Sequence, residues 1–265
     1  MIHALVTGAT DGIGLATARE LNKRGLIVLV HGRGEAKARV AATSVGPQAV
    51  PVWGDLGSLK QVRALAVQTG EVLAGAPLDV LVNNAGVFET ERKESADGHE
   101  LTMAVNHLAP FLLTQQLLPA LKRAPQGRVV NVSSMAHARG HLDLADFDFE
   151  KTFEGYAAYA ASKQANVLFT RAHARRLKGT AVTTYALHPG VIGTKLLKKG
   201  FGSMGGGSLE QGAATSVYCA TAPELAKVTG RYYSDSKEAD AAPQAQDEQL
   251  EEALWTLSEK LTSAA

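Results

Sequence analysis

Short apolar runs rich in β-branched residues alternate with longer amphipathic segments, and this alternation constrains the fold more than any other feature of the chain. The runs that we expect to form strands are Ile2–Thr7, Leu26–His31, Ala49–Trp53, Leu78–Asn83, Gly127–Ser133 and Ala181–His188, with a last one near Gly230–Tyr233. The segments that we expect to form helices are Ile13–Arg24, Glu35–Ser44, Leu59–Leu73, Gly98–Lys122 and Tyr156–Lys178.

Strands that are apolar along their whole length are typical of a parallel sheet that is covered on both faces. When such strands alternate with helices, right-handed βαβ units build a doubly wound sheet. We therefore predict an α/β fold with a doubly wound parallel sheet of about seven strands and helices on both faces. No repeat and no linker divides the chain, so we expect one domain over residues 1–265. Ligands of such folds bind beyond the carboxyl ends of the strands.

Three segments depart from the alternating pattern. Residues 141–154 (HLDLADFDFEKTFE) are acidic and aromatic, and residues 199–208 (KGFGSMGGGS) are rich in glycine. Both are too irregular to be expected as core elements. The C-terminal residues 239–265 begin polar and then become helical, with an apolar stripe that we expect to pack on the body of the protein. The stripe consists of Leu250, Leu254, Leu257 and Leu261.

The overall composition excludes several classes of protein. The formal net charge is +1, which gives no electrostatic reason to expect nucleic-acid binding. The single cysteine, Cys219, excludes an internal disulfide framework, fits a reducing compartment and is expected to be buried. No apolar run approaches the roughly 20 residues of a spanning helix. The first residues show neither a basic region nor a cleavage site. We expect a cytoplasmic protein without a membrane anchor.

The first predicted strand runs into a glycine-rich loop, TGATDGIG, before the first predicted helix. Glycine permits a positive φ and close approach of the backbone to a ligand, and a helix N-terminus favours a phosphate. The spacing of Gly8, Gly12 and Gly14 differs from the commonest dinucleotide fingerprint, so a plain strand-to-helix turn is the alternative. The other residues of this loop that we expect at a nucleotide are Thr10, Asp11 and Ile13.

The end of the second predicted strand bears on which nucleotide binds. An NAD site would have an acidic residue here to accept the ribose hydroxyls, but Gly32 fills the position and Arg33 follows. Arg33 can pair with a 2′-phosphate, although it could equally be a solvated arginine at a helix start. Asp11 would repel that phosphate if it pointed towards it, or it could turn outward and cap the helix at Gly12–Ile13. We predict that NADP(H) is preferred and that NAD(H) is possible.

The next two strand ends supply further candidates for cofactor binding. Asp55 could accept a hydrogen bond from an adenine amino group, or it could cap the helix that begins near Ser58. The fourth strand ends in Asn-Asn-Ala-Gly, where small residues keep the floor of a cleft open. The candidates from these two strand ends are Asp55, Leu56, Asn83, Ala85 and Gly86.

Tyr159 and Lys163 stand four residues apart in a helical pattern and therefore share one face. A phenol normally titrates near ~10. A neighbouring ammonium typically lowers such a pKa by about 1–3 units. We expect Lys163 to bring Tyr159 towards the working range of a general acid–base. The alternative for this pair is an ordinary exposed helical face.

The motifs TGxxxGIG, NNAG, Asn106, Ser134, YxxxK and Pro189-Gly190 fall in this order along the chain. Together they resemble the short-chain dehydrogenase/reductase superfamily over essentially the whole chain. The stretches RVVNVSSMAHARG and YAAYAASKQANVLFTRAHARRLKGTAVTTYALHPGVIGT most resemble its retinol-dehydrogenase-like branch. The resemblance implies a Rossmann fold and a carbonyl–alcohol oxidoreductase.

The resemblance also implies a catalytic set. Tyr159 matches the residue that protonates a carbonyl oxygen in reduction, or accepts the proton in the reverse direction. Lys163 matches the residue that lowers the tyrosine pKa and binds the nicotinamide ribose. Ser134, rather than Ser133, matches the residue that hydrogen-bonds the substrate oxygen, and Asn106 matches the anchor of a water relay to the lysine.

Other parts of the site follow from the same resemblance. The residues expected to border the nicotinamide and pyrophosphate are Pro189, Gly190, Ile192 and Thr194. The glycine-rich residues 199–208 stand where a substrate-covering lid is expected, although a surface loop without function is the alternative. His137 and His141 follow Ser134 and are candidates for the substrate pocket. His107 and His188 are expected to be structural, since neither has metal-ligand spacing, and we predict no metal site.

Many relatives form a four-helix dimer interface from the two long helices predicted at Gly98–Lys122 and Tyr156–Lys178. Small residues on the second helix would permit close packing, and we expect a homodimer or homotetramer. These small residues are Ala157, Ala160 and Ala161.

We therefore predict an NADP(H)-dependent oxidoreductase that interconverts a small apolar ketone or aldehyde and its alcohol by hydride transfer. One alternative is a catalytically silent NADP(H)-sensing regulatory protein, whose mark would be the loss of Tyr159, Lys163 or Ser134; all three are present. Another is an epimerase or dehydratase of nucleotide sugars, but such relatives are usually longer.

Overall fold

The computed structural model describes residues 1–202 and 205–263. In these residues eight strands form one sheet in the order β3-β2-β1-β4-β5-β6-β7-β8. The strands are β1 (His3–Val6), β2 (Ile27–Gly32), β3 (Ala49–Trp53), β4 (Val80–Asn83), β5 (Arg128–Val132), β6 (Thr183–His188), β7 (Arg231–Ser234) and β8 (Lys237–Ala239). Strands β1 to β7 are parallel, and the order reverses between β1 and β4. The predicted doubly wound parallel sheet is confirmed.

Strand β8 is one more than the sequence led us to expect. It pairs antiparallel with β7 through a tight turn in which Asp235 and Ser236 both have positive φ, 50° and 57°. Short hairpins favour such turns because their twist matches that of the strands. The strand escaped prediction because Lys237 and Glu238 are exposed and carry no apolar pattern.

The helices are α1 (Gly12–Lys23), α2 (Glu35–Val45), α3 (Leu59–Leu73), α4 (Leu101–Met103), α5 (Ala109–Lys122), α6 (Gly155–Arg176), α7 (Lys195–Phe201), α8 (Leu209–Thr221) and α9 (Glu248–Ser263). Short 3-10 helices are η2 (Met135–Arg139), η3 (Leu144–Asp146), η4 (Pro223–Leu225) and η5 (Pro243–Ala245). The helix predicted over Gly98–Lys122 is helical from Leu101 onwards, but it is not one regular α-helix. A π-helical turn, η1 (Ala104–Leu108), separates α4 from α5, and π-turns are frequent at functional sites.

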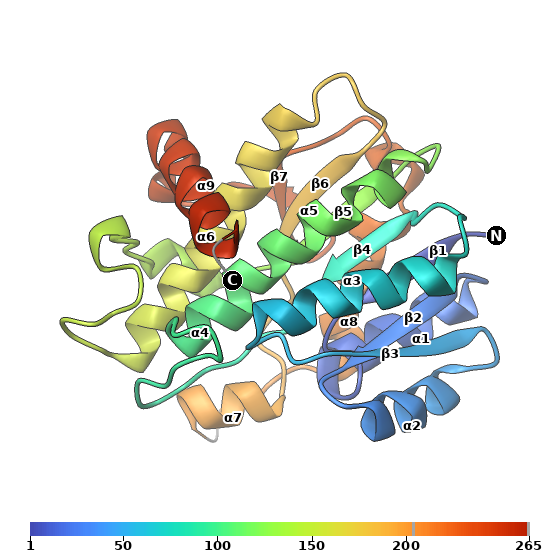
Figure 1. Cartoon of the computed structure of the whole chain (residues 1–265), viewed down its shortest axis with the longest axis horizontal. Coiled ribbons are helices and arrows are strands. Elements are labelled where there is room, and N and C mark those ends of the chain that lie inside the picture. Colours follow the sequence, from blue (N-terminus) through green and yellow to red (C-terminus); the bar gives the residue numbers. More distant parts are fainter. Residues whose placement is uncertain (203–204, 264–265) are drawn as a thin grey trace.

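Alternating side chains of the central strands build a core on each face of the sheet. Leu5, Leu29 and Leu81 point to one face, which α3, α5 and α6 cover. Val6 and Val30 point to the other face, against α1, α2 and α8. Figure 1 shows α3 and α5 crossing one face of the sheet, with α7 apart from both helical layers. Each fully buried Leu or Val contributes about 1.5–3 kcal/mol, so these two layers dominate folding.

The predicted apolar stripe near the C-terminus packs on the body as α9. Leu254 is buried in the core, and the other three leucines of the stripe are partly buried against it. The fully buried Glu251 carboxylate accepts a hydrogen bond from Arg171 Nε at 2.7 Å and pairs with Arg175, both on α6. Trp255 reaches α5, with its ring centroid 5.0 Å from that of Phe111. Residues 264–265 of the predicted segment lie outside the described residues.

Helix α9 covers the helix faces that we expected at a dimer interface. It packs along α6 and touches α5. Ala160 and Ala161 are fully buried inside the chain, and only Ala157 of the three small residues is partly exposed. Their small size therefore serves packing within this chain rather than the contact we expected.

Two further expectations concern burial. Residues 141–154 are irregular, as predicted, but Leu142 and Phe147 are buried in the same core as Leu254, so this loop is partly a core segment. Its acidic residues alternate with apolar ones, which lets the loop turn one side inward. Cys219 is buried and free, as expected.

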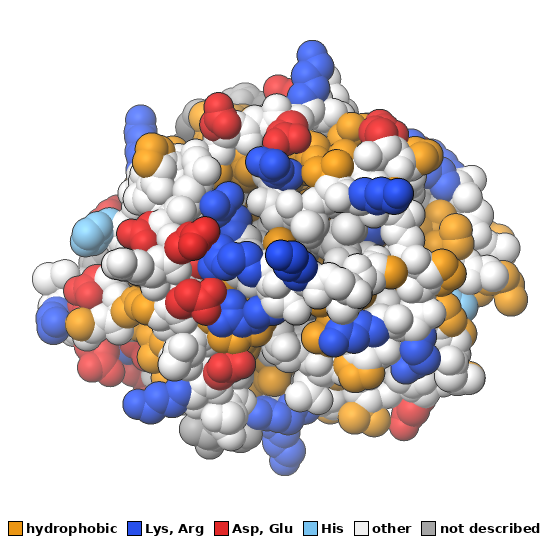
Figure 2. Space-filling model, turned by 90° about the horizontal axis from the view of Figure 1, so that it is seen from above, with side chains coloured by type: hydrophobic (Ala, Val, Ile, Leu, Met, Phe, Trp, Pro, Cys, Tyr) orange, Lys and Arg blue, Asp and Glu red, His pale blue; other side chains and the backbone are white. Residues whose placement is uncertain are grey.

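Charged side chains of both signs are interspersed on the face shown in Figure 2, with hydrophobic side chains in small scattered patches. This distribution fits the net charge of +1. Within residues 1–202 and 205–263, no helix is long and apolar enough to cross a membrane.

Candidate active site

A cavity of about 1480 Å³ opens beyond the carboxyl ends of the strands. The predicted site residues that line it are Gly8, Thr10, Asp11, Gly12, Ile13, Gly14, Arg33, Asp55, Leu56, Ala85, Gly86, Ser134, Tyr159, Lys163, Pro189, Gly190, Ile192 and Thr194. They come from six separate strand ends and from α6, so the fold brings most of the predicted site together. Asn83 and Asn106 are described but are not among its lining residues.

The three glycines of the first loop are each required by geometry. Gly8 and Gly12 have φ of +63° and +57°, which side chains rarely adopt. A Cβ on Gly14 would lie 2.3 Å from both the Gly8 carbonyl oxygen and Asn84 Nδ2. The start of α1 therefore sits directly against the loop, with its N-terminus facing the cavity. This cradle fits a pyrophosphate group.

Side chains behind the loop fix its shape. The Gly8 N–H donates to His31 Nδ1 at 3.1 Å, and His31 Nε2 donates to the Gly54 carbonyl at 2.9 Å. Burial lowers the pKa of His31, which keeps the ring neutral so that it can accept from Gly8. Thr7 Oγ1 accepts from the backbone N–H of Asn84 at 2.9 Å. His31 could not be singled out from the sequence beyond its place at a strand end.

Asp11 is the N-cap of α1. Its Oδ1 accepts from the Gly12 N–H at 2.8 Å, and its Oδ2 forms an ion pair with Lys195 Nζ at the start of α7. The hydrogen bond from Lys195 holds the pKa of Asp11 below its usual value. Of the two orientations considered from the sequence, the structure therefore shows the helix cap. Lys195 was not anticipated.

At the nucleotide end of the cavity, a side chain in place of Gly32 would require Thr10 to move. A Cβ there would lie 2.5 Å from Thr10 Cγ2. Arg33 lines the cavity together with Lys37. Asp55 is not the helix cap, because its Oδ1 accepts from the Gly57 N–H at 2.9 Å and Ser58 caps α3.

The two asparagines after β4 have different environments. Asn83 is buried, and its Nδ2 donates to Asn131 Oδ1 at 2.8 Å and to Thr114 Oγ1 at 3.0 Å. The structure therefore places the Asn83 side chain inside the protein, whereas Asn84 lines the cavity. The side chains of consecutive residues at a strand end point in different directions, so Asn84, which was not among the predicted residues, lines the cavity in place of Asn83.

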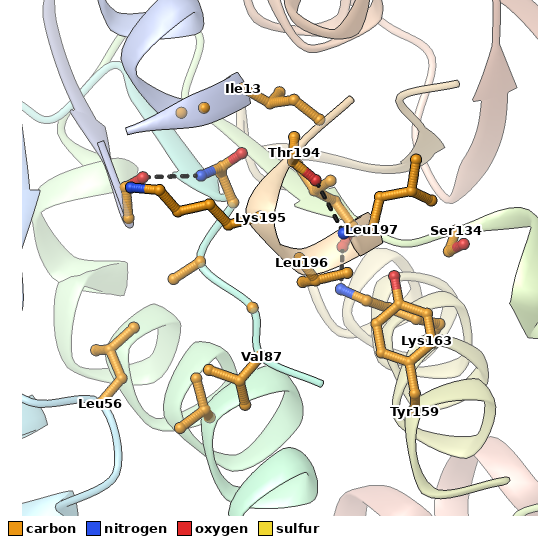
Figure 3. Close-up of a pocket in the computed structure, with 18 of the residues that line it drawn as sticks. Ile13, Leu56, Val87, Ser134, Tyr159, Lys163, Thr194, Lys195, Leu196 and Leu197 are labelled. Atoms are coloured by element: carbon orange, nitrogen blue, oxygen red, sulfur yellow. Dashed lines mark hydrogen bonds between the residues drawn. The ribbon is translucent and has the colours of Figure 1, made fainter. Parts of the chain in front are cut away.

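Tyr159 and Lys163 lie one turn apart on α6 and point into the cavity beside Ser134 (Figure 3). The Ser134 side chain lies near enough to the phenol to lower its pKa. Lys163 Nζ lies 5.5 Å from the Tyr159 ring centroid and donates to the Val132 carbonyl at 3.0 Å. The neighbouring Ser133 is buried, and its Oγ donates to the Lys163 carbonyl at 2.7 Å. Only the second serine of the pair lies beside the phenol.

Burial dominates the titration of both groups on α6. It raises the pKa of Tyr159 to about 12, although the hydrogen bond from Ser134 opposes this shift. It lowers the pKa of Lys163 to about 8. Lys163 is not among the groups that shift the pKa of Tyr159, which burial raises rather than lowers. The Lys163 ammonium donates to the Val132 carbonyl, and the effect of burial on the Tyr159 pKa outweighs the effect of Ser134, which lowers it.

Asn106 lies in the π-turn η1 and is completely buried. Its Oδ1 accepts from the Val87 N–H at 2.8 Å, and its Nδ2 donates to the Val87 carbonyl and to Ser162 Oγ, both at 3.0 Å. A Cβ on Gly86 would lie 3.4 Å from both Asn106 Oδ1 and Lys163 Nζ. Asn106 thus holds the loop after β4, and Gly86 of this loop lies close to both the Asn106 side chain and Lys163 Nζ.

Helix α7 lies where a lid was expected, but it begins before the glycine-rich stretch. Its far end is tied to the loop after β4, since Lys199 Nζ lies 2.6 Å from Glu89 Oε1 and a Cβ on Gly200 would lie 2.8 Å from the Phe88 ring. Leu196 packs with Phe88 and Tyr159. Residues 203–204 of the predicted lid lie outside the described residues.

The histidines near Ser134 are arranged differently from expectation. His137 is buried, with Nδ1 donating to the Ser134 carbonyl at 2.7 Å and Nε2 accepting from the Ala242 N–H at 3.1 Å. His188 lines the cavity, whereas His137 and His141 are not among its lining residues. In the described part of the chain, no three His, Cys, Asp or Glu side chains are grouped to hold a metal ion.

Comparisons with known proteins show what the chain as a whole is similar to. Residues 2–203 match the family model described as short chain dehydrogenase. The chain is 41% identical to retinol dehydrogenase 12 of Bos taurus and 39% identical to retinol dehydrogenase 14 of Homo sapiens. Each match covers 96% of this chain and 84% of the relative. A crystal structure of an uncharacterised protein from Mycobacterium paratuberculosis matches with a TM-score of 0.85 and 33% identity. It covers 99% of this chain and 94% of that chain.

Proposed function

Because the chain belongs to the short-chain dehydrogenase/reductase family, in its retinol-dehydrogenase-like branch, it is an oxidoreductase that uses a nicotinamide dinucleotide, and we propose the finer details of its reaction. It prefers NADP(H) and interconverts a small apolar ketone or aldehyde with its alcohol. Residues 1–265 form one domain, a proposal that the single continuous sheet supports.

The convergence of Ser134, Tyr159 and Lys163 on one cavity with the glycine loop carries this proposal. Bound along the loop, the dinucleotide supplies or accepts the hydride. The chain has to orient the carbonyl, deliver a proton to its oxygen and keep water away. We assign the proton to Tyr159, the orientation of the substrate oxygen to Ser134, and the ribose hydroxyls to Lys163.

The titration of Tyr159 supports the reductive direction. With a pKa raised to about 12 by burial, the phenol stays protonated at neutral pH and can act as an acid. Ser134 and Tyr159 line the same part of the cavity, so a carbonyl oxygen placed between the two hydroxyls would be polarised by both. The reverse reaction needs the phenolate, which the burial of Tyr159 disfavours.

The proposed preference for NADP(H) rests on the nucleotide end of the cavity. Gly32 supplies no carboxylate where an NAD site has an acidic residue, and a side chain there would meet Thr10 Cγ2 at 2.5 Å. Arg33 and Lys37 line this end and offer two positive charges to a 2′-phosphate. With Asp11 turned into a helix cap and paired with Lys195, the main electrostatic objection to a phosphorylated cofactor is reduced.

An apolar substrate fits the lining of the cavity beside Tyr159. Met135 is 59% exposed and Val191 is 37% exposed, and both line the cavity together with Leu196 and Leu197. Exposed apolar side chains at a cavity are typical of ligand-binding surfaces. The relatives named retinol dehydrogenase favour the same class of substrate.

Assembly and location remain predictions. We retain a homodimer or homotetramer as a proposal, but it would need a surface other than the α5–α6 face, because α9 covers that face. The cytoplasmic location is likewise proposed.

The proposal is tested first by calorimetric titration with NADPH and with NADH, and then by a panel of apolar ketones and aldehydes with the tighter cofactor. We expect NADPH to bind more tightly, and Arg33→Ala to weaken NADPH by about tenfold or more while NADH changes less. Equal changes for both cofactors would contradict the role of Arg33. Tight NADPH binding without turnover of any carbonyl would favour the sensor alternative.

A further inference from the structure

The ion pair between Asp11 and Lys195 joins two walls of the cofactor cavity. Asp11 belongs to the glycine loop, and Lys195 is the first residue of α7. The two segments are in contact, since a Cβ on Gly12 would lie 3.7 Å from Thr194 Cγ2. Figure 3 shows Lys195 extending away from Tyr159 and Lys163, while Leu196 and Leu197 follow it on the same helix.

This pair matters for charge rather than for folding. The Lys195 side chain is 90% exposed and that of Asp11 is 58% exposed, and ion pairs so open to water contribute little to stability. A dinucleotide, however, brings its phosphates to the glycine loop, where the Asp11 carboxylate is a fixed negative charge. Asp11 also experiences the charge of Lys37, which lines the cavity with Arg33. Asp11 therefore stands among the cations that we assign to the phosphates.

We infer that Lys195 is a cofactor-selecting residue, which neutralises Asp11 so that the loop accepts the phosphate-rich dinucleotide, NADP(H). The inference rests on the proposed function. Because NADPH carries a phosphate that NADH lacks, an uncovered Asp11 would penalise NADPH more than NADH. Since Lys195 is on α7, the same contact links cofactor selection to the helix whose Leu196 packs against Tyr159.

The test is a charge-balance cycle made of Lys195→Met, Asp11→Asn and the double variant, read as dissociation constants for NADPH and NADH. We expect Lys195→Met to weaken NADPH by about tenfold and NADH by about threefold at low salt. The double variant again has a neutral pair and should bind NADPH within about twofold of the wild type. Lys195→Arg keeps the charge and should also stay near the wild type.

Lys198 provides the matched control. It lies on the same helix and lines the same cavity, and no ion pair is found for it among the described residues. Lys198→Met removes the same charge without uncovering Asp11, so NADPH and NADH should change by a similar factor. Thermal melts of every variant should coincide with the wild type, because the pair is exposed.

Two results would overturn the inference while leaving the proposed function intact. One is wild-type NADPH binding that Lys195→Met does not weaken relative to NADH. The other is a double variant that binds NADPH as weakly as Lys195→Met alone. A wild type that binds neither cofactor would instead refute the proposed function, and the inference with it.

Discussion

The adjacent serines after β5 offer the sharpest separation of catalysis from structure. Both serines line the cavity. The Ser134 side chain acts on Tyr159, whose pKa it lowers, and its Oγ accepts from the Ala136 N–H at 3.2 Å. Ser133 is buried, and its Oγ donates to the Lys163 carbonyl on α6 at 2.7 Å. Replacing either by alanine removes one hydroxyl, but only the Ser133 hydroxyl is bonded to the backbone of α6.

Ser134→Ala should mainly lower turnover, whereas Ser133→Ala should mainly lower stability. A lost donor at a developing oxyanion lowers kcat by about 10²–10³-fold, or about 2.7–4 kcal/mol. Ser134→Ala should therefore lose turnover by about this factor and also lose about 1 kcal/mol of stability from the cap of η2. Ser133→Ala breaks one buried hydrogen bond, which contributes about 0.5–1.5 kcal/mol. That loss lowers Tm by about 2–4 °C per kcal/mol, and turnover should change by less than about fivefold.

The assay is NADPH oxidation with the best carbonyl of the panel, paired with thermal melts and calorimetric NADPH binding for both variants. Both should bind NADPH within about threefold of the wild type, because neither hydroxyl is assigned to the cofactor. The reasoning is refuted if Ser133→Ala loses as much turnover as Ser134→Ala at equal cofactor affinity.

Two further predictions concern the glycine loop and His173 of α6, which lies against α9. Gly14→Ala forces a Cβ to within 2.3 Å of the Gly8 carbonyl oxygen, so it should abolish NADPH binding and lower stability by about 1–3 kcal/mol. Gly12→Ala has 3.7 Å to its nearest neighbour and should lower stability by about 1 kcal/mol in thermal melts. Equal losses of stability and of NADPH binding in the two variants would contradict this prediction. His173 is buried beside Trp255, and burial lowers its pKa to about 4. The neutral ring therefore stabilises the folded state fully above the ordinary histidine pKa of 6.5, and this stabilisation is lost as pH falls towards 4. His173→Phe should reduce the loss of unfolding free energy between pH 8 and pH 5, measured in urea, by about 2 kcal/mol, and an unchanged loss would refute the assignment.

The fold could be predicted because its strands are buried on both faces and therefore carry continuous apolar runs. Where burial is one-sided or absent, the pattern fades. Strand β8 is exposed, and α7 carries three lysines in seven residues. The break between α4 and α5 is a local π-turn, which leaves the helical periodicity on both sides almost unchanged.

The site could be predicted to the level of its motif residues, because spacing along parallel strands fixes which loops meet. Contacts between distant segments could not. Nothing in the sequence links Asp11 to Lys195, 184 positions later. The pKa of Tyr159 could not be predicted either, because its burial depends on side chains such as Phe88 and Leu196, which belong to other elements. The choice between Asn83 and Asn84 likewise depends on the direction of each side chain.

Single-turnover reduction by Tyr159→Phe tests the central claim most directly. The variant keeps the ring that packs at 5.5 Å from Phe88 and removes only the hydroxyl. We predict that NADPH binds within about threefold of the wild type while hydride transfer to the carbonyl falls by about 10²–10⁴-fold. Transfer at the wild-type rate with NADPH bound would contradict the assignment of Tyr159 as the proton donor.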